Sequence, residues 1–256
     1  NMAMDTIGKS QKKKNAVATV LMIILFTILA ILIVLPIYAI FMASFHPGNF
    51  LLQYGLNLDP DFAHMTLSNY VLLFTGDHDY WIWFGNSLIL TVLTVVLTLL
   101  ISSFVAYGFA AYDFKGKNFF FVIVLIILSI PFEVIMLPLY KQISTWGLMD
   151  SYVAVVLPFL AHASTIFFFR QYLLGLPKSL IEAGRIDGAT EYGIFFKLIV
   201  PIMKPAFSAM AILNGMNAWN NYMWPLLVIR SSSKYTLTIG LNTLINPYGD
   251  NYSLLV

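Results

Sequence analysis

Long uncharged apolar blocks alternate with shorter polar segments along this chain. The first block covers residues 17–45, and the others cover 84–112, 118–140, 152–169 and 206–229. A helix needs about 20 mostly apolar residues to cross a bilayer core of ~30 Å. The pattern therefore predicts an all-α membrane protein, a polytopic bundle with one transmembrane helix per block.

Proline interrupts four of these blocks, at Pro36, at Pro131 and Pro138, at Pro158 and at Pro225. A proline inside a helix leaves a backbone carbonyl without its donor, and a soluble helix tolerates this poorly. In a membrane bundle, neighbouring helices can satisfy the freed carbonyl. The prolines are therefore expected to kink the spans.

The composition agrees with a membrane protein. Hydrophobic residues make up 59% of the chain and charged residues only 10%, against about 25% in an average soluble protein. The net charge of +2 is too small to indicate a nucleic-acid partner. Because there is no cysteine, disulfides, thiolate metal sites and cysteine nucleophiles are excluded.

The basic residues between the blocks predict the orientation. With a cytoplasmic N-terminus, only Lys141, Arg230 and Lys234 lie outside. The basic residues on the cytoplasmic side are then Lys9, Lys12, Lys13, Lys14, Lys115, Lys117, Arg170, Lys178, Arg185, Lys197 and Lys204. Cytoplasmic loops are enriched in Lys and Arg, so we expect a multi-pass membrane protein with its N-terminus in the cytoplasm.

No catalytic or metal-binding pattern is present. Gly8-Lys9-Ser10 lacks the first glycine of a phosphate-binding loop, and no serine lies in a G-x-S-x-G turn. The four histidines, His46, His64, His78 and His162, are scattered. We therefore expect no catalytic residue and no metal site, and the chain is not expected to be an enzyme.

Residues 173–205, between the fourth and fifth blocks, have a different character. Ser179 and Glu182 have the spacing of a capping box, which predicts a helix start. Gly188 should end that helix in a left-handed turn, and Thr190 should cap a second helix. The apolar stripe of the second helix is Ile194, Phe195, Leu198 and Ile199. The segment is predicted to be a helix, a turn and a helix on the membrane surface.

This segment resembles the EAA signature of the permease subunits of bacterial ABC importers. The signature reads Glu182-Ala183-Gly184, then Gly188, then Leu198-Ile199-Val200-Pro201. Other stretches are similar to the carbohydrate-uptake branch, specifically its maltose-type second permease, namely AYGFAAYDFKGKNFFF, PFEVIMLPLY, STWGLMDSY and AWNNYMWPLL. The resemblance covers nearly the whole chain.

The resemblance implies a transport subunit for a sugar or oligosaccharide in the bacterial plasma membrane. It implies a heterodimer with a homologous permease, ATPase subunits that hold ATP and Mg, and an extracellular or periplasmic solute-binding protein; this chain itself binds no cofactor. The implied ATPase-coupling residues are Glu182, Ala183, Gly184, Asp187, Gly188 and Pro201. In the plainer alternative, Glu182 and Gly188 only cap a helix, and Ile194 to Ile199 only pack against the bundle.

The family has six helices, and the blocks of this sequence predict five. The uncharged run Tyr252–Val256 is where a sixth span would begin, so that span is expected to be absent from this chain.

Polar residues inside the blocks indicate a substrate pathway, because burying them in lipid is costly. Asn214, Asn217 and Asn221 are three and four positions apart and should share one helix face, with Tyr222 and several tryptophans nearby. Amides and aromatic rings together suit a sugar. Glu133, two residues after Pro131, could also bind substrate in this pathway. The alternative for the amides is helix-to-helix bonding, and the alternative for Glu133 is a bond to a freed backbone group.

Two other functional classes stay open at this point. The chain could be a stand-alone carrier or channel driven by protons or ions, with Glu133 and His162 as proton sites. It could also be a membrane scaffold without transport. Dependence of uptake on ATP hydrolysis separates the importer from both.

Overall fold

The computed structural model describes residues 2–46, 62, 64–76 and 79–244 of the chain, and its side chains from residue 18 on. These residues form helices joined by turns, with no strand among them, which confirms the all-α prediction. Two compact units are present, Asn1–His78 with Leu244–Val256, and Asp79–Thr243. The run Tyr252–Val256, where a sixth span was expected to begin, lies outside the described residues.

In the described part of the first unit there are one long helix and one short helix. Helix α1, Met2–Ala43, includes Pro36 without a break, and its part Ala18–Ala43 is long and apolar enough to cross a membrane. The helix starts before the predicted span because the preceding lysines are good helix formers. Helix α3, Ser68–Thr75, is fixed to the end of α1 by the Asn69 amide, which donates to the carbonyls of Ser44 (3.0 Å) and His46 (2.8 Å).

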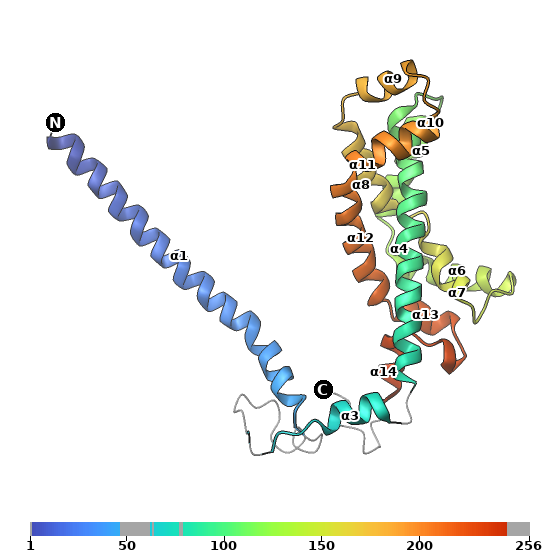
Figure 1. Ribbon diagram of the computed structural model, residues 1–256, viewed down its shortest axis with the longest axis horizontal. Coiled ribbons are helices and arrows are strands. Elements are labelled where there is room, and N and C mark those ends of the chain that lie inside the picture. The colour runs from blue at the N-terminus through green and yellow to red at the C-terminus, as the bar shows by residue number, and fades with distance from the viewer. Residues whose placement is uncertain (1, 47–61, 63, 77–78, 245–256) are drawn as a thin grey trace. The chain divides into compact units, whose positions relative to one another are not determined.

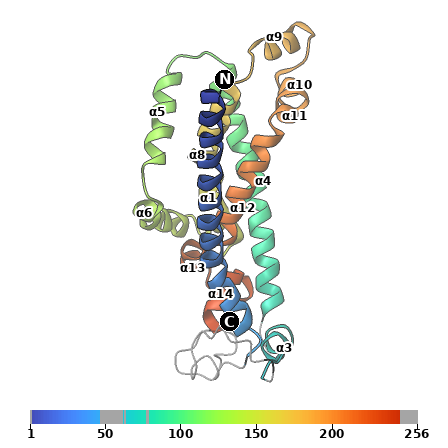
Figure 2. The same ribbon diagram turned by 90° about the vertical axis from the view of Figure 1, so that its left-hand side faces the viewer.

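The second unit is built on the 32-residue helix α4, Tyr80–Ala111. Helices α8, Ala163–Leu174, and α12, Lys204–Trp219, pack along α4 (Figures 1 and 2). The buried side chains between them are Ala106, Tyr107, Phe169, Leu173, Ala206 and Met210, with Ile194, Phe195, Ile199 and Met203 added from the segment before α12. Alternation of large and small side chains lets the three helices approach closely.

Two predicted spans are broken rather than straight. Helix α5, Lys117–Leu128, and helix α6, Phe132–Thr145, are bent by 102° because Pro131 is extended and disfavours helical backbone in the residue before it. In the fourth span, helix α7, Tyr152–Val156, and the 3₁₀ turn η1, Leu157–Phe159, meet α8 at 42°. The predicted bends are therefore present at Pro131 and next to Pro158, and the bend at Pro131 exceeds a right angle. Pro36 and Pro138, by contrast, lie inside helices that continue past them.

The fifth block also differs from the prediction of one helix over 206–229. Helix α12 ends at Trp219, where the Asn220 amide donates to the Met216 carbonyl at 2.9 Å, and a turn leads to helix α13, Met223–Val228. Asparagine favours such ends because its amide competes for backbone groups. Among the described residues, two helices are long and apolar enough to span a membrane, or up to five if each bent pair is one span.

The remaining elements lie at the two ends of α4. The segment α9–α11 lies across the end at which α4 finishes (Figure 1). It comprises α9 (Ser179–Ile186), α10 (Glu191–Ile194), the π-helix η2 (Phe195–Ile199) and α11 (Val200–Ile202). The opposite end carries the 3₁₀ turn η3 (Ser232–Lys234) and α14 (Leu237–Leu244).

Asp150, between α6 and α7, anchors the chain after α13. Its backbone is left-handed, with φ of 56°, and its carboxylate accepts hydrogen bonds from the backbone nitrogens of Arg230 (2.9 Å) and Ser231 (3.0 Å). The Ser231 hydroxyl and the Lys234 ammonium also donate to it. These bonds, led by that of the Ser231 hydroxyl, hold the pKa of Asp150 well below its usual range.

Candidate functional site

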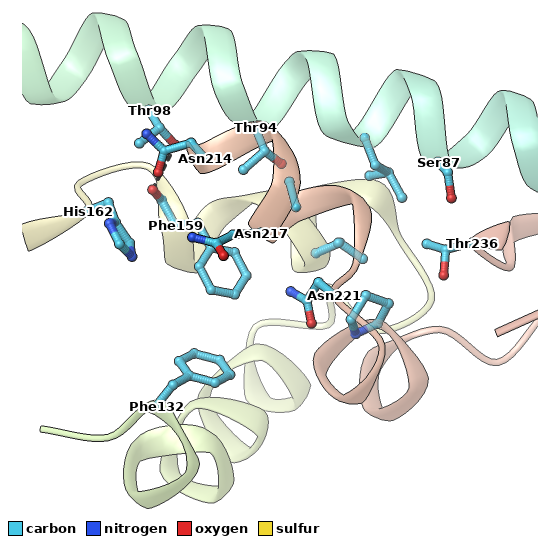
Figure 3. A pocket seen from close by; sticks show the side chains of 14 residues that line it. Ser87, Thr94, Thr98, Phe132, Phe159, His162, Asn214, Asn217, Asn221 and Thr236 are labelled. Atoms are coloured by element: carbon cyan, nitrogen blue, oxygen red, sulfur yellow. Dashed lines mark hydrogen bonds between the residues drawn. The ribbon is translucent and has the colours of Figure 1, made fainter. Parts of the chain in front are cut away.

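A cavity of about 260 Å³ lies between α4, the α7–α8 break, α12 and α13 (Figure 3). Its lining contains no charged side chain. The polar members are Ser87, Thr94, Thr98, His162, Asn214, Asn217, Asn221 and Thr236, and the apolar members are Leu90, Phe132, Val155, Phe159, Ala218 and Pro225. The cavity can therefore offer hydrogen bonds and apolar contact without an electrostatic preference for a charged solute.

The three amides predicted to share one face do line this cavity, but they differ in their partners. Asn214 is buried, and its Nδ2 donates to the Thr165 hydroxyl of α8 at 3.1 Å. The side-chain amides of Asn217 and Asn221 make no hydrogen bond with the described part of the chain. Figure 3 shows Asn217 beside the Phe159 ring and Asn221 to one side of the two rings. Asn214 thus joins two helices, whereas Asn217 and Asn221 are available to a solute.

Two phenyl rings form the side of the cavity beside Asn217. The centroids of Phe132 and Phe159 are 5.3 Å apart, with an angle of 36° between the rings (Figure 3). Sequence reasoning did not select either ring as a site residue. Each follows a proline at a helix break, so their approach depends on the size and direction of bends whose presence, but not geometry, the sequence predicts.

Hydroxyl groups of α4 complete the lining. Ser87, Thr94 and Thr98 lie seven and four residues apart, and hence on one helical face. Thr98 donates to the Phe159 carbonyl at 2.8 Å, and Ser87 accepts from the backbone nitrogen of Leu237 at 2.8 Å. Sequence reasoning missed these three residues, although hydroxyl side chains on one face of an apolar helix indicate that this face meets other polar groups.

Two predicted pathway residues lie outside the lining. Glu133 is exposed in the first turn of α6 and makes no hydrogen bond or ion pair with the described residues. The Tyr222 hydroxyl donates to the Asn242 side chain at 3.1 Å. His162 does line the cavity, at the start of α8, where its Nδ1 lies 2.7 Å from the Ser164 hydroxyl.

The predicted turn of the α9–α11 segment is present. Gly188 has φ of +73°, and the backbone nitrogens of Gly188 and Ala189 donate to the carbonyls of Arg185 (3.1 Å) and Gly184 (3.0 Å). This is the Schellman arrangement that glycine favours at a helix C-terminus. The Thr190 hydroxyl accepts from the backbone nitrogen of Gly193 at 3.1 Å, which confirms the predicted cap of the second helix.

The predicted capping box of Ser179 and Glu182 is wrong. Helix α9 begins at Ser179 as expected, but the residue at its cap is Lys178, with helical backbone and no side-chain cap bond. The backbone nitrogen of Leu180 already donates to the Pro177 carbonyl at 3.1 Å, so the first turn starts before Ser179. Ser179 is therefore inside the helix, where its hydroxyl cannot act as a cap. Glu182 is exposed beside a crevice of about 70 Å³ under α9.

Helix α9 rests closely on the following helix at Gly184. A Cβ atom at this position would lie 3.0 Å from side-chain carbons of both Ile194 and Leu198. Ile194, Phe195 and Ile199 are themselves buried in the bundle core, as the plainer interpretation of the apolar stripe required. Ala183, Asp187 and Pro201 are exposed. The segment thus presents one face to solvent while its stripe fixes it to the bundle.

Glu191, which sequence reasoning did not select, joins this segment to α4. Its Oε1 accepts from Nε of Arg185 at 2.6 Å, and its Oε2 accepts from the Tyr107 hydroxyl at 3.0 Å. The hydrogen bond from Arg185, followed by those from Tyr112 and Tyr107, lowers the pKa of Glu191 to about 2. The sequence could have indicated this ion pair, because Arg185 and Glu191 have opposite charges and lie on either side of the Gly188 turn.

The long apolar helices and the bundle that they form are those of a polytopic membrane protein. Residues 99–256 match the model of a family described as "binding-protein-dependent transport system inner membrane component". The chain belongs to this family, and it is therefore an inner-membrane permease subunit of an importer that works with an ATPase and a solute-binding protein. Permease subunits of this kind are not themselves enzymes.

Two relatives are about half identical to this chain. The arabinooligosaccharides transport system permease protein AraQ of Halalkalibacterium halodurans is 50% identical over 246 residues, 96% of this chain and 88% of the relative. AraQ of Bacillus subtilis is 51% identical over 231 residues, 90% of this chain and 82% of the relative.

A solved structure has the same fold. It is a crystal structure of a bacterial ABC transporter involved in the import of the acidic polysaccharide alginate, with a TM-score of 0.81 and 24% sequence identity. The match covers 94% of this chain and 90% of that one.

Proposed function

We propose that this permease subunit imports a neutral sugar or oligosaccharide of the pentose type, using ATP and Mg held by the partner ATPase. The single observation that carries this proposal is the cavity of about 260 Å³. Its lining has no charged side chain, two amides without a hydrogen-bond partner among the described residues, and a pair of phenyl rings. Amides can hydrogen bond to sugar hydroxyls, and rings can stack on the apolar face of a sugar. The names of the two half-identical relatives support the same substrate class.

In this proposal the subunit works as a heterodimer with a homologous permease, and this cavity supplies one wall of the pathway. Ligand sites for small molecules usually occupy about 300–1,000 Å³. A cavity of about 260 Å³ in one subunit therefore suits a shared site. The second wall would come from the partner permease, and the sugar would reach both from the solute-binding protein.

The exposed face of α9 is proposed to dock on the ATPase at the cytoplasmic surface. Ala183, Asp187 and Gly188 lie on exposed positions there, and Ile186 is 85% exposed. An apolar side chain with this exposure is suited to insertion into a partner's groove. The excess of Lys and Arg on the same side of the predicted spans supports a cytoplasmic N-terminus.

Reconstituted transport tests the substrate class. The four-component importer is placed in liposomes, and uptake of a labelled neutral arabino-oligosaccharide is compared with uptake of an oligosaccharide of a uronic acid of similar length. We expect uptake of the neutral sugar only, driven by ATP and unaffected by a protonophore. Preferred uptake of the acidic sugar would overturn the substrate class. Uptake without ATP, stopped by the protonophore, would favour the stand-alone carrier instead.

Cysteine labelling tests the orientation, and these 256 residues include no cysteine that would interfere. Single cysteines are introduced as Ile186→Cys in α9 and Ser232→Cys in η3, two exposed positions. A membrane-impermeant maleimide on intact cells should label the cysteine at position 232 and not that at 186. The reverse result would place α9 outside the cell and remove the proposed ATPase contact.

A further inference from the structure

The carboxylate of Glu191 is shared between two structural elements. One oxygen accepts from Arg185 of the surface helix α9 at 2.6 Å, and the other accepts from Tyr107 of the long helix α4 at 3.0 Å. The guanidinium carbon of Arg185 also lies 5.5 Å from the centre of the Tyr112 ring, just beyond the end of α4. The three polar groups therefore form a continuous link from α9 through Glu191 to α4.

Stability alone does not account for this arrangement. The side chains of Arg185 and Glu191 are 39% and 38% exposed, and ion pairs with such exposure contribute little to folding stability. Tyr107, by contrast, is buried in the core between α4, α8 and α12. The link thus joins a solvent-facing cation to a fixed side chain inside the bundle.

The elements on the outer side of the link are held together as one piece. Gly184 of α9 packs on Ile194 and Leu198, and the Gly188 turn and the Thr190 cap close the connection between α9 and α10. Movement of α9 is therefore expected to carry Glu191 with it. Glu191 then passes the force to the Tyr107 hydroxyl through a hydrogen bond.

Helix α4 connects that hydroxyl to the cavity. It is continuous from Tyr80 to Ala111, and Ser87, Thr94 and Thr98 of the same helix line the cavity. Thr98 precedes Tyr107 by nine residues, about 14 Å along a helix axis. A rigid helix transmits a displacement over this distance without needing a further hinge.

We propose that Glu191 is a positioning residue that transmits movement of α9 to the cavity-lining helix α4 through Arg185 and Tyr107. The proposal rests on the proposed function, because it assumes that an ATPase moves α9. It assigns Glu191 no part in holding the ATPase or in binding the sugar. Loss of the link should therefore separate ATP hydrolysis from uptake while leaving the assembly intact.

The test measures sugar molecules taken up per ATP hydrolysed by the complete importer, and ATPase retention on the purified permease pair. Tyr107→Phe removes one donor, and Glu191→Gln removes the charge that Arg185 binds. Asp113→Asn is the matched control, because the exposed Asp113 carboxylate pairs with Lys117 near the end of α4 and lies outside the link. The charge exchange Arg185→Glu with Glu191→Arg tests whether the pair itself matters.

We expect Tyr107→Phe and Glu191→Gln to retain the ATPase and to lower uptake per ATP by roughly 2- to 30-fold, the range that mutations in coupling networks produce. The control should match the natural chain, and the charge exchange should restore part of the uptake that Arg185→Glu alone loses. Unchanged uptake per ATP in both link variants would overturn the proposal, and so would loss of ATPase retention. Failure of the proposed function is distinguishable, because the unmodified importer would then show no ATP-driven uptake.

Discussion

The cavity and the α9–α11 segment use polar side chains in opposite ways. In the cavity the polar groups are uncharged, and the amides of Asn217 and Asn221 have no partner in the described chain. In the α9–α11 segment, both oxygens of Glu191 are occupied, and the backbone is fixed by the Gly188 turn. A surface that binds a solute keeps groups free for it, whereas a surface that transmits movement needs groups already joined.

The largest effect is expected from a change in α14, at the end of α4 opposite the α9–α11 segment. In Gly240→Ala, the new Cβ would lie 2.1 Å from a ring carbon of the buried Trp83, which cannot move aside like a flexible chain end. Such overpacking costs typically about 1–3 kcal/mol or more. We expect a lower Tm of the purified permease pair and loss of sugar uptake, with ATPase retention preserved.

Gly215→Ala is the control for that change, since its Cβ would make an ordinary contact of 3.7 Å with Val95. The comparison between the two regions would fail if Gly240→Ala released the ATPase while Gly215→Ala did not.

The next effect concerns the opposite region. Gly188→Ala puts a Cβ on a residue with φ of +73°, which costs an L-residue roughly 1–2 kcal/mol. Gly108→Ala is matched, because a Cβ at either position would meet no atom within 4 Å, and no positive φ is recorded for Gly108. ATPase retention should fall in Gly188→Ala only, together with a fall of a few degrees in the Tm of the permease pair that Gly108→Ala does not show. Equal ATPase retention in both variants would show that the Gly188 turn is not part of the surface that docks on the ATPase.

A smaller effect should divide the cavity amides by their partners. Asn214→Leu leaves the buried Thr165 hydroxyl without its partner, at a cost of about 1 kcal/mol, so the Tm should fall. Asn217→Leu removes no bond within the described chain and should leave the Tm unchanged. If the Tm fell equally in both variants, Asn217 would be a packing residue rather than a group free for the solute.

The smallest effect is expected from pH, because Glu191 should not titrate between pH 5 and 8. The pKa of Glu191 is lowered to about 2, so the stability that the carboxylate contributes is present above the ordinary pKa of 4.5 and is lost as pH falls toward 2. Between pH 5 and 8, the Tm difference between the natural chain and Glu191→Gln should stay constant. A difference that shrinks from pH 7 to pH 5 would show that Glu191 titrates there and is not paired with Arg185.

Much of this architecture was predictable from local sequence. The apolar blocks identify the membrane segments, and Pro131 marks the sharpest bend, although the sequence did not indicate that it would reach 102°. Gly188 was predictable because a left-handed turn after a helix favours one residue type. The false capping box arose because Pro177 starts the helix turn two residues earlier than the Ser179 pattern suggests.

The partners of the polar side chains could not be predicted in the same way. Helical spacing places Asn214 and Asn217 near one another, but only the packing of α8 gives Asn214 its Thr165 partner. Likewise, Glu191 reaches Tyr107 across 84 positions of sequence. Such contacts depend on how helices meet, which the periodicity of a single helix does not contain.

The central claim is that a neutral sugar passes this cavity and bonds to its free amides. The most direct test is the initial rate of ATP-driven uptake, at a sub-saturating concentration of a neutral arabino-oligosaccharide, by importers carrying Asn217→Leu with Asn221→Leu. The control is Asn220→Leu, a neighbouring amide that lies outside the lining. Two lost hydrogen bonds of about 0.5–1.5 kcal/mol each predict a fall of roughly fivefold or more in the double variant, with little change in the control. An unchanged rate in the double variant, with ATPase retention intact in both, would contradict the claim.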